Sequence, residues 1–123
     1  MKLKELTKAE EEVMRLLWKR GKGFVKDLLD DMSEPKPAYN TVSTIVRILE
    51  TKGFVGHKAY GKTHEYFPLV SQEAYSDFLM KNMMKHYFGN SFKSMVSFFA
   101  QKNQLSVKEM DELLKELKKS QHD

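Results

Sequence analysis

Residues 38–52 read AYNTVSTIVRILETK and are followed by Gly53. At about 100° per residue, the apolar side chains of this stretch fall on one face of a helix. These apolar residues are Val42, Ile45, Val46 and Leu49. The opposite face is polar and carries Asn40, Ser43, Thr44 and Arg47, with Thr41 at its margin. We therefore predict an amphipathic helix that begins near Pro37, buries its apolar face and ends at Gly53, a residue suited to a left-handed cap.

Two shorter helices are predicted before this stretch. Thr7 and Glu10 form the sequence pattern of a capping box, after which apolar residues recur at helical spacing until two glycines interrupt them. The first helix is therefore expected over residues 8–20. A second, short helix is expected over residues 24–32, because two prolines follow it.

The chain after Gly53 changes from helical spacing to two short runs of β-branched and aromatic residues. The runs read FVGHKAY and THEYFPLV, with a turn at Gly61 between them. This pattern predicts a β-hairpin. Helical spacing returns at Ser71, breaks at Gly89-Asn90 and ends with a last piece over residues 105–117, which opens with a second capping-box pattern.

The composition is typical of a soluble globular protein. The chain has 123 residues, of which 41% are hydrophobic and 31% charged, enough for a small domain with an appendage. No apolar run approaches the ~20 residues of a membrane helix. No apolar stretch follows the N-terminal lysines either, so we expect a cytoplasmic protein without membrane insertion. The absence of cysteine excludes disulfides and thiolate metal sites.

The positive charge is concentrated in one part of the chain. Residues 36–64 contain five lysines and arginines against one glutamate, a net charge of +4 that equals the net charge of the whole chain. A polyanion such as DNA is therefore expected to bind there.

Three helices followed by a basic hairpin are the parts of a winged helix-turn-helix, in which the third helix enters the major groove of DNA. We therefore predict a mainly α fold with a small β-hairpin wing. Residues 1–70 form the predicted winged helix-turn-helix domain, and residues 71–123 form a predicted helical dimerisation domain.

The predicted DNA-contacting residues fall into two groups. Side chains able to hydrogen-bond base edges lie on the polar face of the third helix; they are Asn40, Thr41, Ser43, Thr44 and Arg47. Side chains suited to the phosphate backbone lie at the start of that helix and around the hairpin turn; they are Lys36, Tyr39, Lys58, Tyr60, Lys62 and His64.

Two other interpretations remain open from these residues. A polar helix face can be merely solvated, or it can dock on a partner protein in a winged-helix interaction module. The basic hairpin beside the helix favours DNA over both. A winged-helix repressor that is released by a small-molecule ligand is a further alternative.

Several stretches resemble the penicillinase repressor (BlaI/MecI/CopY) family of winged-helix transcriptional repressors. These are LTKAEEEVMRLLWKRG at residues 6–21, YNTVSTIVRILETKGFV at 39–55 and YFPLV at 66–70. The resemblance implies a homodimeric repressor of stress- or β-lactam-responsive genes that binds a dyad-symmetric operator. It also implies a membrane sensor that leads to proteolysis of the C-terminal segment.

The predicted dimerisation surface consists of apolar residues whose helical stripes are too wide for one small wing domain to cover. They are Tyr75, Phe78, Leu79, Met83, Phe88, Phe92, Met95, Val96, Phe99, Met110, Leu113, Leu114 and Leu117.

The chain departs from its resemblance to the family in two places. Copper-responsive relatives carry C-terminal cysteines, and this chain has none. The resemblance places the protease-sensitive Asn-Phe bond of the β-lactam-responsive repressors at Phe98-Phe99, where this chain has Phe in place of Asn.

No arrangement of residues points to catalysis, a metal or a cofactor. There is no Ser/His/Asp set or carboxylate pair suited to an enzyme. His57, His64 and His86 lack the i, i+4 spacing of helical metal ligands, so no metal site is predicted. Trp18 follows two leucines on the first helix and is expected to pack in the core or at a domain junction.

Overall fold

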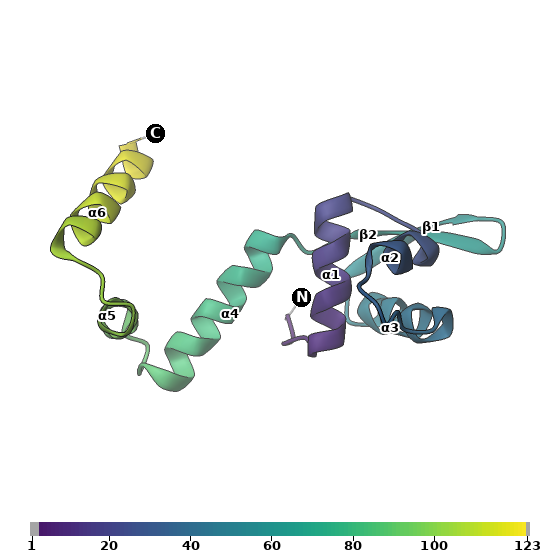
Figure 1. Ribbon diagram of the computed structural model, residues 1–123, viewed down its shortest axis with the longest axis horizontal. Coiled ribbons are helices and arrows are strands. Elements are labelled where there is room, and N and C mark those ends of the chain that lie inside the picture. The colour runs from purple at the N-terminus through teal and green to yellow at the C-terminus, as the bar shows by residue number, and fades with distance from the viewer. Residues whose placement is uncertain (1–2, 123) are drawn as a thin grey trace. The chain divides into compact units, whose positions relative to one another are not determined.

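The computed structural model describes residues 3–122 (Figure 1). They divide into two compact units, Met1–Met80 and Lys81–Asp123. The elements are α1 (Lys8–Arg20), α2 (Val25–Asp31), α3 (Tyr39–Thr51), β1 (Val55–Tyr60), β2 (Thr63–Pro68), α4 (Gln72–Tyr87), α5 (Phe92–Lys102) and α6 (Val107–His122). The predicted mainly α fold with one hairpin is confirmed. The domain boundary predicted after residue 70 stays a prediction.

Helix α1 begins with the capping box that the sequence predicted. The backbone N–H of Glu10 donates to Oγ1 of Thr7 at 3.2 Å, and the N–H of Thr7 donates to Oε1 of Glu10 at 3.0 Å. Two of the backbone donors that a helix start leaves without partners are thereby satisfied. The helix ends at Gly21, whose φ of 88° lies where only glycine is free of strain.

Helix α3 begins at Tyr39, two residues later than the predicted start at Pro37. Ala38 is the N-cap, because its backbone is extended while its carbonyl already accepts from the N–H groups of Thr41 and Val42. The predicted cap at Gly53 is confirmed: its φ is 84°, and its N–H donates to the carbonyl of Glu50.

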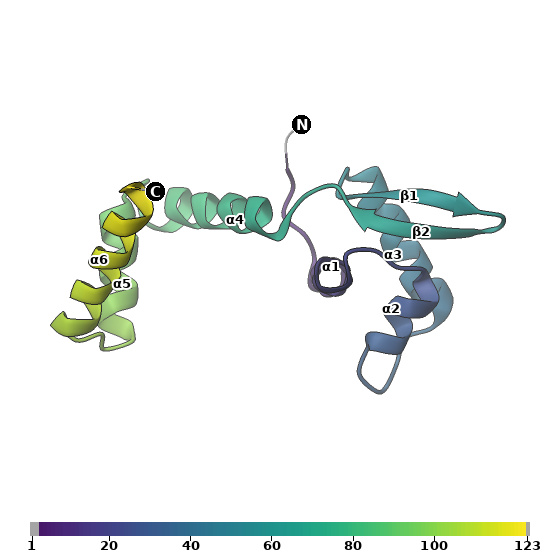
Figure 2. The same cartoon turned by 90° about the horizontal axis from the view of Figure 1, so that it is seen from above.

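Strands β1 and β2 pair antiparallel, with Tyr60 opposite Thr63 across a two-residue turn. Gly61 occupies the turn with a φ of +64°, which explains why glycine stands there. Gly23, just before α2, extends the hairpin by exchanging both backbone hydrogen bonds with Tyr66 at 2.8 and 2.9 Å. Figure 2 shows the hairpin projecting beyond α2 and α3.

The core of the N-terminal unit lies among α1, α2, α3 and the hairpin. Val42, Val46 and Leu49 of α3 are fully buried, and Ile45 packs at the edge of the same cluster. The apolar face predicted for this helix is therefore confirmed. Its burial leaves the opposite face of α3 free to contact a partner.

Trp18 packs at the junction between α1 and the start of α4, in line with its predicted packing role. Its indole N–H donates to the carbonyl of Val70 at 2.9 Å, and its ring lies 6.1 Å from that of Tyr75. Tyr75 belongs to the core of the N-terminal unit, with 3% of its surface exposed, and its hydroxyl accepts from the N–H of Leu6 at 2.8 Å.

The second unit contains the end of α4 followed by α5 and α6. The predicted break at Gly89-Asn90 is present, since both residues have positive φ values, 56° and 63°. Met95 of α5 is buried, and the ring of Phe88 lies 5.5 Å from that of Phe98. Within residues 3–122, no helix is long and apolar enough to span a membrane.

Candidate nucleic-acid interface

The outward face of α3 presents the residues predicted to contact bases. Asn40, Thr41, Thr44 and Arg47 are exposed, and Ser43 is half-buried. Nε of Arg47 donates to the carbonyl of Ser43 at 3.3 Å, and its Nη2 lies 3.4 Å from Oγ1 of Thr44. These contacts hold the guanidinium along the helix surface, where its remaining N–H groups can reach a base or a phosphate.

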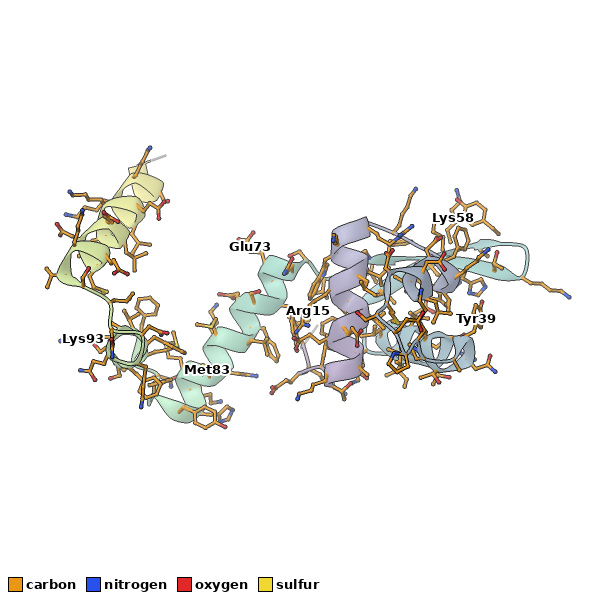
Figure 3. All side chains as sticks on the ribbon, viewed as in Figure 1. Arg15, Tyr39, Lys58, Glu73, Met83 and Lys93 are labelled. Carbon is orange, nitrogen blue, oxygen red and sulfur yellow. The ribbon has the colours of Figure 1, made fainter. Side chains whose placement is uncertain are left out.

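The N-terminal end of α3 carries two of the predicted backbone contacts. Tyr39 is 52% exposed, so its hydroxyl is accessible. Nζ of Lys36 donates to the carbonyl of Asp30 at 3.2 Å, which holds the loop between α2 and α3 without neutralising the ammonium charge. Figure 3 shows that Tyr39 on α3 and Lys58 on β1 lie on the same side of α1.

The hairpin tip holds three more of the predicted backbone contacts. Nζ of Lys58 lies 5.3 Å from the centroid of the Tyr60 ring, a cation–π distance. The Tyr60 ring in turn lies 5.7 Å from Phe24. Lys62 is exposed in the turn itself. The aromatic contacts position Lys58 at the hairpin surface, whereas Lys62 projects at its end.

The hairpin face that looks toward α3 carries a stacked pair of histidines. The rings of His57 and His64 lie 4.1 Å apart and are nearly parallel, and Nδ1 of His57 lies 2.5 Å from Oε2 of Glu50 on α3. Tyr66 is buried on the same face, and burial raises the pKa of its hydroxyl. His64 is a predicted phosphate contact, and one face of its ring is therefore covered by the ring of His57.

The role of His57 in joining the hairpin to α3 was not predicted from the sequence. The alternation of β1 and β2 was the signal available for it, because paired residues share a face of the hairpin. His57 and His64 lie together, but in the part of the chain that the structure describes no three histidine or carboxylate side chains form a metal-binding group.

The basic residues of α3 and the hairpin differ in how their charges are compensated. Lys52 is paired with Glu10, at 2.7 and 3.0 Å. Among the described residues, no carboxylate forms an ion pair with Lys36, Arg47, Lys58 or Lys62. This surface is therefore positively charged where an incoming phosphate would meet it.

The residues predicted to form the dimer are divided between the two units. Tyr75 is buried in the N-terminal unit, and Phe78 and Leu79 pack against the same core, so contacts within the chain already occupy much of their surface. Met83 is exposed on α4, and Phe88, which directly follows that helix, is half-buried. On α5, Met95 is buried, Val96 is half-buried, and Phe92 and Phe99 are exposed.

Helix α6 carries an exposed apolar stripe. Leu113, Leu114 and Leu117 are 43%, 53% and 50% exposed, and Met110, one turn earlier, is half-buried. Their i, i+3, i+4 spacing places all four on one side of the helix, opposite charged residues such as Lys119. Such a stripe on a single helix is typical of a helix–helix interface.

Phe98 and Phe99, the predicted cleavage region, lie inside α5. Both side chains are exposed, at 44% and 40%, but their backbone is helical. A protease binds its substrate in an extended conformation, so cleavage at this bond requires α5 to unwind locally.

Comparison with known proteins places the chain in a family. The family model described as penicillinase repressor matches residues 6–119. The chain belongs to the penicillinase repressor family. The resemblance seen in the sequence is thus confirmed, and the chain is a winged-helix repressor of the DNA-binding type.

Individual relatives agree with this assignment. The methicillin resistance regulatory protein MecI of Staphylococcus aureus (strain N315) is 29% identical over 110 residues, which cover 89% of each chain. The penicillinase repressor of Bacillus licheniformis is 26% identical over 113 residues, covering 91% of this chain and 88% of the relative. The solution structure of the DNA-binding domain of the repressor BlaI superposes with a TM-score of 0.53 at 25% identity, covering 60% of this chain and 92% of that domain.

Proposed function

We propose that this repressor binds a palindromic operator as a homodimer, with α3 in the major groove and the hairpin along the phosphate backbone. One observation carries the proposal. The polar face of α3 is exposed, and the basic side chains beside it form no ion pair with a carboxylate among the described residues. Asn40 and Arg47 are side chains that form paired hydrogen bonds with adenine and guanine edges. Lys58 and Lys62 neutralise phosphates beside them.

The second half of the proposal is a dimer held by the apolar side chains of the second unit. The stripe of Met110, Leu113, Leu114 and Leu117 on α6 is covered when the same stripe of another copy packs on it, since a two-fold axis brings identical surfaces together. The same axis relates the two α3 helices, as binding to the two half-sites of a palindrome requires.

We further propose that the protein acts in the bacterial cytoplasm and that the genes it regulates are stress- or β-lactam-responsive, because relatives carry the names methicillin resistance regulatory protein and penicillinase repressor. Release follows from proteolysis of the C-terminal segment, initiated by a membrane sensor-protease. A cut in the C-terminal segment anywhere before α6, which includes the region of Phe98 and Phe99, separates the α6 stripe from the winged helix. Operator affinity then falls, because two linked binding events become two independent ones.

Titration of the full-length protein onto genomic DNA fragments at two salt concentrations tests the DNA-binding part. A small set of fragments should bind much more tightly than the rest, and raising the salt concentration should weaken binding to all of them. Equal affinity for every fragment, or binding that salt does not change, would contradict the proposal.

A further inference from the structure

A groove runs along one edge of α3, where the N-terminal arm, residues 3–7, passes the end of the helix. It is an open groove of about 400 Å³, bordered by Lys4, Thr44, Arg47, Ile48, Thr51 and Lys52. Thr44 and Arg47 belong both to this groove and to the face proposed to read bases. The groove is therefore continuous with the proposed DNA-binding surface.

The arm is held in place on both sides of Lys4. Leu3 packs against the core cluster, and Leu6 is buried within it. The N–H of Leu6 also donates to the hydroxyl of Tyr75 at 2.8 Å. Because the backbone is anchored before and after Lys4, this residue is kept beside α3.

The groove has an uncompensated positive charge. None of its six bordering residues is acidic. The charge of Lys52 is offset by Glu10, but among the described residues neither Lys4 nor Arg47 forms an ion pair with a carboxylate. The hydroxyl groups of Thr44 and Thr51 donate to backbone carbonyls of α3, so the two cations are the groups that would attract an anion.

The groove and the hairpin lie on opposite edges of α3. Glu50, which contacts His57 of the hairpin, marks one edge. Ile48 and Lys52 border the groove and lie on the other edge, since they are about 160° away from Glu50 around the helix. A helix seated in the major groove has a phosphate strand along each of its edges. The two edges of α3 therefore face different DNA strands.

We propose that Lys4 at this groove binds a backbone phosphate of the operator, on the strand opposite the one that the hairpin contacts, while Arg47 beside it reads bases. The proposal rests on the proposed mode of DNA binding. The arm then adds a second phosphate contact to that of the hairpin. Helix α3 is thereby fixed to the DNA backbone along both of its edges.

Salt-dependent DNA binding by full-length variants tests the role of the Lys4 charge. Lys4→Ala should weaken binding to specific and non-specific DNA several-fold and reduce the salt slope by about 1 per subunit. Lys19→Ala removes the same charge from an exposed position at the other end of α1 and should leave both quantities unchanged. If Lys4→Ala binds with wild-type affinity and slope while Arg47→Ala weakens binding, the groove proposal is wrong.

Strand assignment gives a second test, because the chain has no cysteine and accepts a single unique label. Iron-EDTA attached to Lys4→Cys should cleave one strand of each half-site, and the same label on Lys62→Cys should cleave the other strand. Cleavage of the same strand by both, or none from Lys4→Cys, overturns the proposal. If the unlabelled wild-type protein binds no DNA in a salt-dependent manner, the proposed DNA-binding function itself fails.

Discussion

The ammonium nitrogen of Lys52 lies 2.7 Å from Oε1 and 3.0 Å from Oε2 of Glu10. Glu10 is buried, and the same carboxylate accepts from the N–H of Thr7 in the capping box of α1. One side chain thus begins α1 and ties it to the end of α3. Burial acts to raise the pKa of Glu10, but the hydrogen bonds from Lys52 and Thr7 outweigh it and leave the pKa below its ordinary value of 4.5.

Stability should therefore depend on pH through Glu10. Because the folded carboxyl has the lower pKa, the unfolded chain binds more protons in the range just below pH 4.5, and the stabilisation is lost as the pH falls through the folded value. Glu10→Gln should lower the free energy of unfolding by about 2 kcal/mol near neutral pH. The difference from wild type, measured by urea denaturation, should shrink in acid.

Glu12→Gln is the matched control, since Glu12 is exposed on the same helix. It should change the unfolding free energy little at any pH. If the difference in unfolding free energy between wild type and Glu10→Gln stays constant from neutral to acidic pH, the charge of Glu10 does not contribute to stability.

Tyr75→Phe should destabilise the N-terminal unit by about 1–2 kcal/mol. The substitution removes the hydroxyl that accepts from the N–H of Leu6 and leaves this donor without its partner. Thermal or urea unfolding measures the loss. Tyr87→Phe removes the same hydroxyl from a residue that is 80% exposed and should be neutral. Equal stability of the two variants would show that the hydrogen bond from Leu6 to Tyr75 does not stabilise the N-terminal arm.

Arg47 and Lys62 should differ in the kind of binding they support. Arg47→Ala should weaken operator binding more than non-specific binding, by about 1–3 kcal/mol, because it removes a base-reading group. Lys62→Ala should weaken both and reduce the salt slope by about 1. Arg15→Ala, a loss of the same charge on α1, controls for net charge. The reverse pattern in a filter-binding assay would reject the assigned roles.

The apolar stripe of α6 should control the oligomeric state. Leu113→Glu combined with Leu117→Glu places two carboxylates in the proposed interface, where no partner would satisfy them. Light scattering should then report a monomer of 14.4 kDa in place of a dimer. Lys119→Glu changes the charge on the opposite face of α6 and should leave the dimer intact. A wild-type protein that is already monomeric, or a double variant that stays dimeric, would exclude this interface.

Local patterns explain why so much of the fold could be predicted. The capping box of α1 spans four residues, the cap of α3 depends on one glycine, and the hairpin turn depends on Gly61. Each signal acts through hydrogen bonds or backbone angles close by in the chain. The start of α3 was predicted two residues early, because a proline can occupy the first turn of a helix as well as the position before its cap.

Contacts between distant residues could not be predicted in the same way. Tyr75 is apolar and periodic with its neighbours, so its sequence pattern fits a dimer surface as well as an internal core. The structure places it against Leu6, 69 residues away. No local sequence pattern pairs His57 with Glu50, because their contact forms only when the hairpin folds back on α3.

The sequence by itself determined the order and kind of the elements, the buried face of α3, the concentration of positive charge in residues 36–64 and the family. Each of these depends on periodicity, local capping or composition. Only the tertiary structure decided which charges remain available: it pairs Lys52 with Glu10 and places Lys4 beside Arg47. The physical reason is that charge compensation depends on distances of a few ångström between segments whose approach is set by the packing of the whole core.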